Sequence, residues 1–405
     1  MQQESDDTSY GSQGKGGQEK EPHQLLDKRF SRSQFFSGAG KLAVGGMGLG
    51  SMGGLLAACG SSSKGSSKAA KAASSAAKGK VKRVAVVEES FSSFFAVNFE
   101  KPLNEYLKAK QSGWSSAFAN EKGNAGTAVK ELEEFAAAEA AITILSDGRP
   151  GTTFEHTVES ITKEGSLFFD HSTGAVTGAT QNVLFSHKEA GVEIGKAAIA
   201  WAEKNKVTAP VVGLIGDLEE SQARKRTEWA WKTIKAHFSN AVLAGEVEGT
   251  ESEEGAKAAA NLLSAHPTMN MLICFNTIAG TTAKTSAEHA GKTDPSSFFL
   301  GVTDFEETTL KMIATGKSIM QANYVSFFPY SMILMAEDGI NFIEKKKPIQ
   351  PTRLILGVPV TEPSEAKSIE TIVFKPLDPK NAYVYTKYFK YLDVTLKTGE
   401  TPPGQ

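Results

Sequence analysis

Short apolar runs alternate with amphipathic stretches of helical periodicity from Val81 onward, and this alternation limits the fold more than any other feature. The apolar runs predict buried strands at 83–87, 141–145, 166–169, 210–215, 271–275 and 298–302. The periodic stretches predict helices at 95–109, 126–140, 188–205, 221–238, 251–265, 278–291, 305–316 and 329–346. Such alternation indicates an α/β fold with parallel sheets covered by helices on both faces. Because so many units exceed one compact core, we expect two sheets.

Composition excludes several classes of protein. The chain has 405 residues with a formal net charge of −2. It therefore lacks the excess of basic residues that would point to nucleic acid as a partner. Two cysteines are too few for a disulfide-stapled scaffold or a four-cysteine zinc site. Cys274 lies inside an apolar run and is interpreted as a small core residue. We expect neither a metal site nor a cofactor.

Residues 1–58 have the organisation of an export signal with a polar N-terminal extension. Lys28, Arg29 and Arg32 precede the uncharged stretch 42–58. A transmembrane helix is the alternative, but six of these seventeen residues are Gly, and spanning a bilayer takes about 20 mostly apolar residues. The segment 31–36 resembles a twin-arginine signal with Ser33 in place of the second arginine, so the export route stays open.

Cys59 is the predicted lipidation site. The segment Leu56-Ala57-Ala58-Cys59 resembles a bacterial lipobox, which implies that the cysteine becomes the first mature residue and carries lipid. Residues 60–80 contain only Ser, Ala, Gly and Lys, a composition typical of a flexible tether. The range 59–80 is therefore predicted to hold the protein at the outer face of the cytoplasmic membrane or in the periplasm.

Polar and aromatic side chains follow most of the predicted strands. In open α/β sheets, ligands bind beyond the carboxyl ends of the strands. Aromatic rings can cover the C–H face of a sugar, while carboxylate, amide and guanidinium groups bind its hydroxyls. This chemistry predicts a monosaccharide or polyol ligand bound by Glu88, Ser92, Phe94, Phe95, Asp170, His171, Arg226, Asn276, Asp304 and Asn323.

Each of these residues also has a structural interpretation. Polar residues at strand ends are common in turns and at helix N-caps, and Phe94 and Phe95 can belong to the core. His171 can be a satisfied surface histidine. Arg226 has the stronger case because the folded part holds only five arginines, and a guanidinium offers a rigid fork for vicinal hydroxyls.

The chain from Val81 to Pro359 resembles the type 1 periplasmic sugar-binding proteins that feed ABC importers. The resemblance is carried by the opening VAVVEESFSSFF, the Arg-x-Arg stretch at 216–226, the segment 261–267 followed by MLICFN, and Gly-Val-Thr-Asp at 301–304. It implies that Phe94 and Phe95 stack on the sugar and that Arg226 binds it. The chain departs from ribose binders at Glu88, Ser92, His171 and Thr277, where that family has a small polar residue, Asn, Arg and Asp.

The resemblance also implies an architecture and partners. Two Rossmann-like lobes would be joined by a three-strand hinge with crossings near 186, 325 and 354. The N-terminal lobe would comprise 81–186 plus 325–353, the C-terminal lobe 187–324 plus 354–375, and 376–405 would form a tail. A monomer without enzymatic activity would close on the ligand in the interlobe cleft and dock on an ABC-transporter permease.

Rival functions lack their motifs or stay open. The folded region has no G-x-S-x-G and the chain no H-E-x-x-H, and the P-loop-like ends at 291–293 and 316–318 lack the upstream Gly. A hydrolase built on Asp170 and His171 is disfavoured because adjacent strand residues point apart. The export signal argues against a transcription factor. A ligand-sensing receptor that docks on a signalling membrane protein stays open, since it would use the same lobes.

Overall fold

The computed structural model describes residues 79–89, 96–110, 112–146, 151–171, 175–218, 221–373 and 393–395. All of these belong to one unit, Gly60–Gln405. The predicted export signal, Cys59, most of the tether, and Ser92, Phe94 and Phe95 lie outside the described residues. Within the described part of the chain, no helix is both long and apolar enough to cross a membrane.

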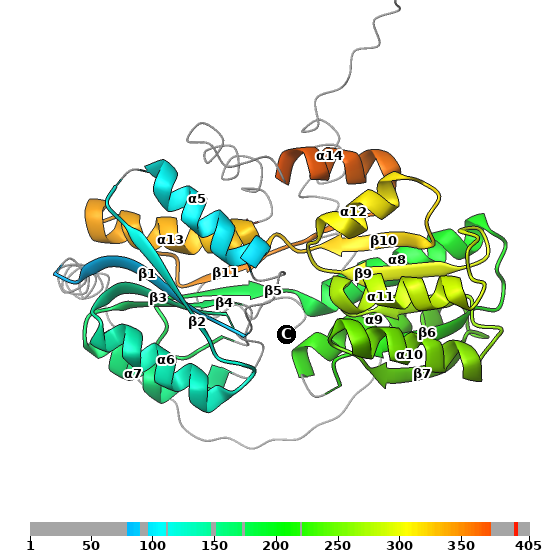
Figure 1. Ribbon diagram of the computed structural model, residues 1–405, viewed down its shortest axis with the longest axis horizontal. Coiled ribbons are helices and arrows are strands. Elements are labelled where there is room, and N and C mark those ends of the chain that lie inside the picture. Colours follow the sequence, from blue (N-terminus) through cyan, green and yellow to red (C-terminus); the bar gives the residue numbers. More distant parts are fainter. Residues whose placement is uncertain are drawn as a thin grey trace, which may run out of the picture. The chain divides into compact units, whose positions relative to one another are not determined.

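Two largely parallel sheets organise the chain (Figure 1). The first has the order β13-β11-β5-β4-β3-β1-β2. Its strands are β1 (Val81–Glu88), β2 (Ser115–Asn120), β3 (Ala140–Ser146), β4 (Leu167–His171), β5 (Gln181–Phe185), β11 (Thr352–Ile355) and β13 (Asp393–Thr395). Only β13 is antiparallel to its neighbour among these described strands. The predicted α/β class with parallel sheets is confirmed.

The second sheet has the order β12-β10-β9-β8-β6-β7. Its strands are β6 (Val211–Gly216), β7 (Val242–Glu248), β8 (Met271–Cys274), β9 (Phe299–Thr303), β10 (Met320–Val325) and β12 (Val358–Val360). The short strand β12 runs antiparallel to β10, and the other pairs are parallel. Its central strands β8 and β9 are buried throughout, as continuous apolar runs with helices on both faces should be.

Helices cover both faces of the first sheet. On one face, α6 (Ala125–Ala137) and α7 (Glu155–Lys163) bury Leu132, Val158 and Ile161 against Leu145 and Phe168. On the other face lie α5 (Lys101–Lys110) and α13 (Phe328–Lys345), with the π-helical turn η1 (Ala96–Glu100) leading into α5 and the short turn η2 (Gly151–Thr153) preceding α7. The strands of this layer are thus packed against helices on both faces.

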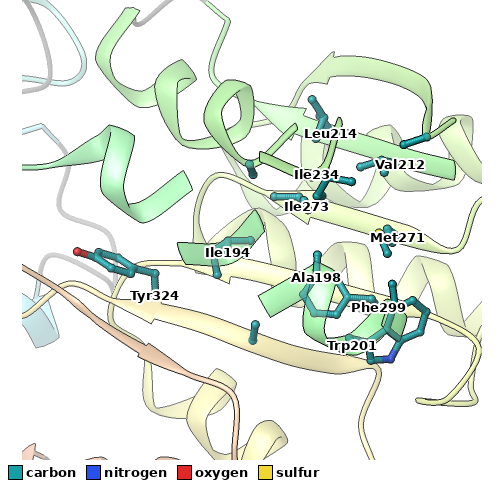
Figure 2. Close-up of a cluster of buried hydrophobic side chains, with 14 of the residues drawn as sticks. Ile194, Ala198, Trp201, Val212, Leu214, Ile234, Met271, Ile273, Phe299 and Tyr324 are labelled. Atoms are coloured by element: carbon teal, nitrogen blue, oxygen red, sulfur yellow. The ribbon is translucent and has the colours of Figure 1, made fainter. Parts of the chain in front are cut away.

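The second sheet carries a hydrophobic core on the face of α8 (His187–Lys204) and α9 (Ser221–His237). Figure 2 shows this cluster, in which Trp201 lies against Phe299 with 5.7 Å between ring centroids, and Tyr324 marks its other end. The opposite face holds α10 (Ser252–Ala265), α11 (Thr277–His289) and α12 (Glu307–Ala314), and α14 (Pro363–Val373) packs on α12. The core therefore fixes α8 and α9 against the strands whose ends carry Asp304 and Asn276.

The chain passes between the sheets after β5, after β10 and after β11, and it returns to the first sheet between β12 and β13. The end of β10 contacts the crossing after β11, because the backbone N–H of Gly357 donates to the Tyr324 hydroxyl over 2.8 Å. A Cβ at position 357 would lie 2.3 Å from Cε1 of Tyr324, so this close approach requires glycine. The lobe boundaries stay a prediction, and so does the tail, of which the backbone at 393–395 pairs with β11.

Candidate functional site

Arg226 and Asp304 form a buried ion pair at the carboxyl end of the second sheet. Arg226 lies on α9, the helix after β6, and Asp304 directly follows β9 with a left-handed φ of 88°. Nη1 of Arg226 lies 2.8 Å from both carboxylate oxygens of Asp304, and the two side chains are 9% and 8% exposed. Nη1 also lies 2.9 Å from the Phe275 carbonyl and from the Thr303 hydroxyl. One edge of the guanidinium is thereby fixed to the ends of β8 and β9.

The first turns of α8 hold the other side of Arg226. Nε of Arg226 donates to Nδ1 of His187 over 3.0 Å. One turn further along α8, a Cβ on Gly191 would lie 2.3 Å from the backbone oxygen of Arg226, so glycine permits the close packing of the two helices. His187 and Gly191 share a helix face because they are four residues apart. Among the described residues, Nη2 of Arg226 makes no hydrogen bond, and ligand binding by Arg226 stays a prediction.

Glu88 ends β1 at the carboxyl edge of the first sheet. It is paired in register with Asn120 on β2 and with Ser146 on β3, and Ser146 is paired with His171 on β4. Paired positions of parallel strands present their side chains to the same face. Glu88 is 0% exposed, and neither carboxylate oxygen has a hydrogen-bond partner among the described residues. Burial, with a smaller contribution from Glu100, raises the pKa of Glu88 to about 8.

Glu88 should make the protein less stable as the pH rises. Its pKa is about 8 in the folded protein against 4.5 for the ordinary carboxyl, so the folded state holds the proton more tightly. The stabilisation is complete below pH 4.5 and is lost as the pH rises through 8, by up to about 1.4 kcal/mol per unit. His171 acts in the opposite direction, but only between about pH 3 and 6.5.

The measurement is urea denaturation between pH 6.5 and 8. We expect the free energy of unfolding to fall across this interval in the wild type and to fall less steeply in Glu88→Gln, in which the buried Glu189, with a pKa raised by burial to about 7, still contributes near pH 7. The exposed Glu253→Gln serves as the control and should keep the wild-type slope. Equal slopes in the wild type and Glu88→Gln would contradict a buried, protonated Glu88.

His171 packs among aromatic rings. Its Nδ1 lies 3.1 Å from the Ser146 hydroxyl, and its Nε2 lies 2.7 Å from the Ser331 hydroxyl on α13. The rings of Phe99, Phe185 and Phe328 lie at centroid distances of 5.3, 5.0 and 5.7 Å. Full burial lowers the pKa of His171 to about 3, so the ring is neutral. Both ring nitrogens contact protein hydroxyls in this structure, and a ligand contact by His171 stays a prediction.

The other predicted residues lie at separate places. Asp170 is buried and is paired with Leu145, whose side chain belongs to the core under α6 and α7, so Asp170 and His171 point to opposite faces. Asn276 is the N-cap of α11: it accepts from the N–H of Ala279 and donates to the Thr250 carbonyl. Asn323 lies inside β10, not beyond it, and donates to Thr309 on α12.

The structure thus brings Arg226 and Asp304 together. Asn276 is the next residue after Phe275, whose carbonyl accepts a hydrogen bond from Arg226. Glu88 and His171 share the edge of the first sheet through Ser146. Sequence reasoning missed His187 and Ser331, although each lies at the start of the helix that follows a chain crossing. No group of metal-ligating side chains is present in the described ranges.

A family model described as a periplasmic binding protein domain matches residues 62–336. The chain belongs to the periplasmic binding protein family. The predicted resemblance is therefore confirmed for family and fold. A comparison with curated proteins gave no match.

Solved structures of periplasmic binding proteins share the fold of this one. An ABC-transporter solute-binding protein of Actinobacillus succinogenes with bound D-allose has 17% identity and a TM-score of 0.62, over 70% of this chain and 99% of that one. A Mycobacterium smegmatis protein in complex with β-D-fucofuranose has 13% identity and a TM-score of 0.63, over 78% and 99%. The myo-inositol binding protein of Caulobacter has 15% identity and a TM-score of 0.61, over 71% and 96%.

Proposed function

We propose that this periplasmic binding protein captures a monosaccharide or similar polyhydroxylated molecule and delivers it to an ABC importer. The observation that carries the proposal is the fixed guanidinium of Arg226. Its Nη1 is anchored on Asp304 and its Nε on His187, while Nη2 keeps its donors. A pre-oriented donor pair at the carboxyl ends of parallel strands suits binding of neighbouring hydroxyls. No step of chemical conversion is required.

The ligands named for the structural neighbours support the choice of a polyhydroxylated ligand. They are D-allose, β-D-fucofuranose and myo-inositol, which share a ring bearing several hydroxyls. In the proposal, the ends of the first sheet supply a second set of contacts, among them Glu88, and the two lobes close on the ligand about the crossings. Phe94, Phe95 and Ser92 belong to the proposed site as predicted from the sequence.

A thermal-shift panel tests the proposed ligand class. The purified protein is heated with pentoses, hexoses, amino sugars, polyols, cyclitols and amino cyclitols in turn. A ligand at about 100 times its Kd should add roughly 2.7 kcal/mol to the free energy of unfolding and raise the melting temperature. At the same ligand concentration the shift should be at most about half as large in Arg226→Lys, because binding weakened about tenfold adds only about 1.4 kcal/mol, and it should be unchanged in Arg224→Lys, whose arginine is exposed and pairs with Glu246. A panel without any shift would contradict the proposal.

Lipidation of Cys59 is part of the proposal and rests on the lipobox-like segment 56–59. Several acyl chains on one residue anchor a protein firmly, at about 0.8 kcal/mol per buried CH₂. We expect the wild type to sediment with membranes and Cys59→Ala to remain in the soluble exported fraction. Equal partition of both forms would contradict the anchor and leave the ligand-binding proposal intact.

A further inference from the structure

Glu88 has a carboxyl group that the described protein leaves without a hydrogen bond. Its two oxygens are buried, its backbone oxygen accepts from the N–H of Glu121, and its side chain lies in the row of Asn120 and Ser146. A buried carboxyl usually has hydrogen-bond partners, since leaving it unpaired is costly. An unpaired carboxyl at this edge of the sheet therefore calls for a partner that the described residues do not supply.

The charged groups around Glu88 favour a cation as its partner. Glu100 on η1 acts on it with the same sign, Glu121 follows β2, and His171 on β4 is neutral. Arg226 already forms an ion pair with Asp304. Among the described residues, no Lys or Arg forms an ion pair with Glu88. An ionised Glu88 would thus be a buried negative charge near a second carboxylate, Glu100. A cationic partner would compensate the charge of Glu88 and reduce its repulsion with Glu100.

We propose that Glu88 binds an ammonium group of the ligand, so that the site takes an amino sugar or an amino cyclitol. This inference rests on the function proposed above and names the ligand class more narrowly. An ammonium supplies three donors and a compensating charge, and charge-assisted hydrogen bonds are about twice as strong as neutral ones. Arg226, at the second sheet, would bind hydroxyls of the same ligand.

Binding then moves one proton. The free protein holds Glu88 as the acid below pH 8, because burial raises its pKa to about 8. When the ammonium of the ligand arrives, the carboxyl O–H bond breaks, the carboxylate accepts hydrogen bonds from the ammonium, and the proton leaves to buffer. A neutral sugar would leave the proton on Glu88. The two ligand classes therefore differ in proton release as well as in affinity.

Isothermal titration with matched ligand pairs tests the inference. The pairs are glucosamine with glucose, galactosamine with galactose, and an aminodeoxyinositol with myo-inositol, each measured at pH 7 in buffers of different ionisation enthalpy. We expect at least one amine to bind about tenfold to a hundredfold more tightly than its hydroxyl partner, as one charge-assisted contact provides. About one proton should be released per amine bound. Glu88→Gln should abolish both the preference and the proton release, and Glu253→Gln should keep them.

The outcomes separate this inference from the proposed function. If neutral members bind as tightly as the amines without proton release, the inference is wrong and the proposed function stands. If neither class binds, the proposed function itself fails. The preference and the proton release of the wild type are measured without a variant, so a Glu88→Gln protein that does not fold would not prevent the test.

Discussion

Arg226→Met is expected to lower the free energy of unfolding by about 3–5 kcal/mol, the usual cost of removing one partner of a buried ion pair. Asp304 is 8% exposed and would lose the guanidinium that lies 2.8 Å from both of its oxygens. Urea denaturation at pH 7 measures the loss. The control is Arg224→Met, which breaks the exposed pair with Glu246 and should cost at most about 1 kcal/mol. Arg226→Met should also lose all ligand binding.

The double variant Arg226→Met/Asp304→Leu separates the buried charge from the packing of α9. Removing both charges should recover much of the stability, because apolar pairs often replace buried ion pairs at little cost. Ligand binding should not return. If Arg226→Met is no less stable than Arg224→Met, the result would contradict a buried ion pair between Arg226 and Asp304.

Gly191→Ala is expected to destabilise the protein by about 1–3 kcal/mol, although alanine in a helix interior normally stabilises by about 1 kcal/mol over glycine. Its Cβ would meet the backbone oxygen of Arg226 at 2.3 Å and that of Lys225 at 3.0 Å, and neither can rotate away. Helix α9 must therefore shift away from α8, and Arg226 with it. We expect the affinity for the ligand to fall together with the stability.

A matched control is Gly126→Ala on α6, where the added Cβ would meet only the Asn124 side-chain oxygen at 3.2 Å. Urea denaturation and ligand titration are measured on both variants. Wild-type stability and affinity in Gly191→Ala would show that the contact of α8 with α9 does not position Arg226.

The sequence predicted most of the central strands, but it missed β2 and β7 at the sheet edges and the interior strands β5 (QNVLF) and β11 (TRLI), which are not continuous apolar runs. β3, β8 and β9, and β1 from Val84 onward, are buried on both faces and therefore appear as continuous apolar runs. β2 (SSAFAN) and β7 (VLAGEVE) lie at edges, where half-exposed polar residues interrupt the pattern. The helix predicted at 126–140 ends at Ala137, because position 140 already pairs with β1. Sequence periodicity does not encode the position of a strand in the sheet, and for this reason it missed the edge strands β2 and β7 and placed the end of α6 too late.

The site was predictable as a set of residues but not as a set of contacts. Strand-end position pointed to Asp304, and the scarcity of arginine together with the family resemblance pointed to Arg226. Only the packing of α8 on α9 shows that the two side chains form an ion pair and that His187 contacts it. His171 was singled out for the same reason, yet a partner 160 positions away, Ser331, satisfies its ring. Such pairings depend on which helix covers which strand, so local sequence could not supply them.

The measurement that tests the central claim most directly is the Kd of the best panel ligand for the wild type, Arg226→Lys and Arg224→Lys by isothermal titration. The account predicts saturable binding to one site, weakened at least about tenfold in Arg226→Lys because lysine lacks the rigid fork, and unchanged in Arg224→Lys. Binding of equal strength in all three forms, or no binding by any polyhydroxylated ligand, would contradict it.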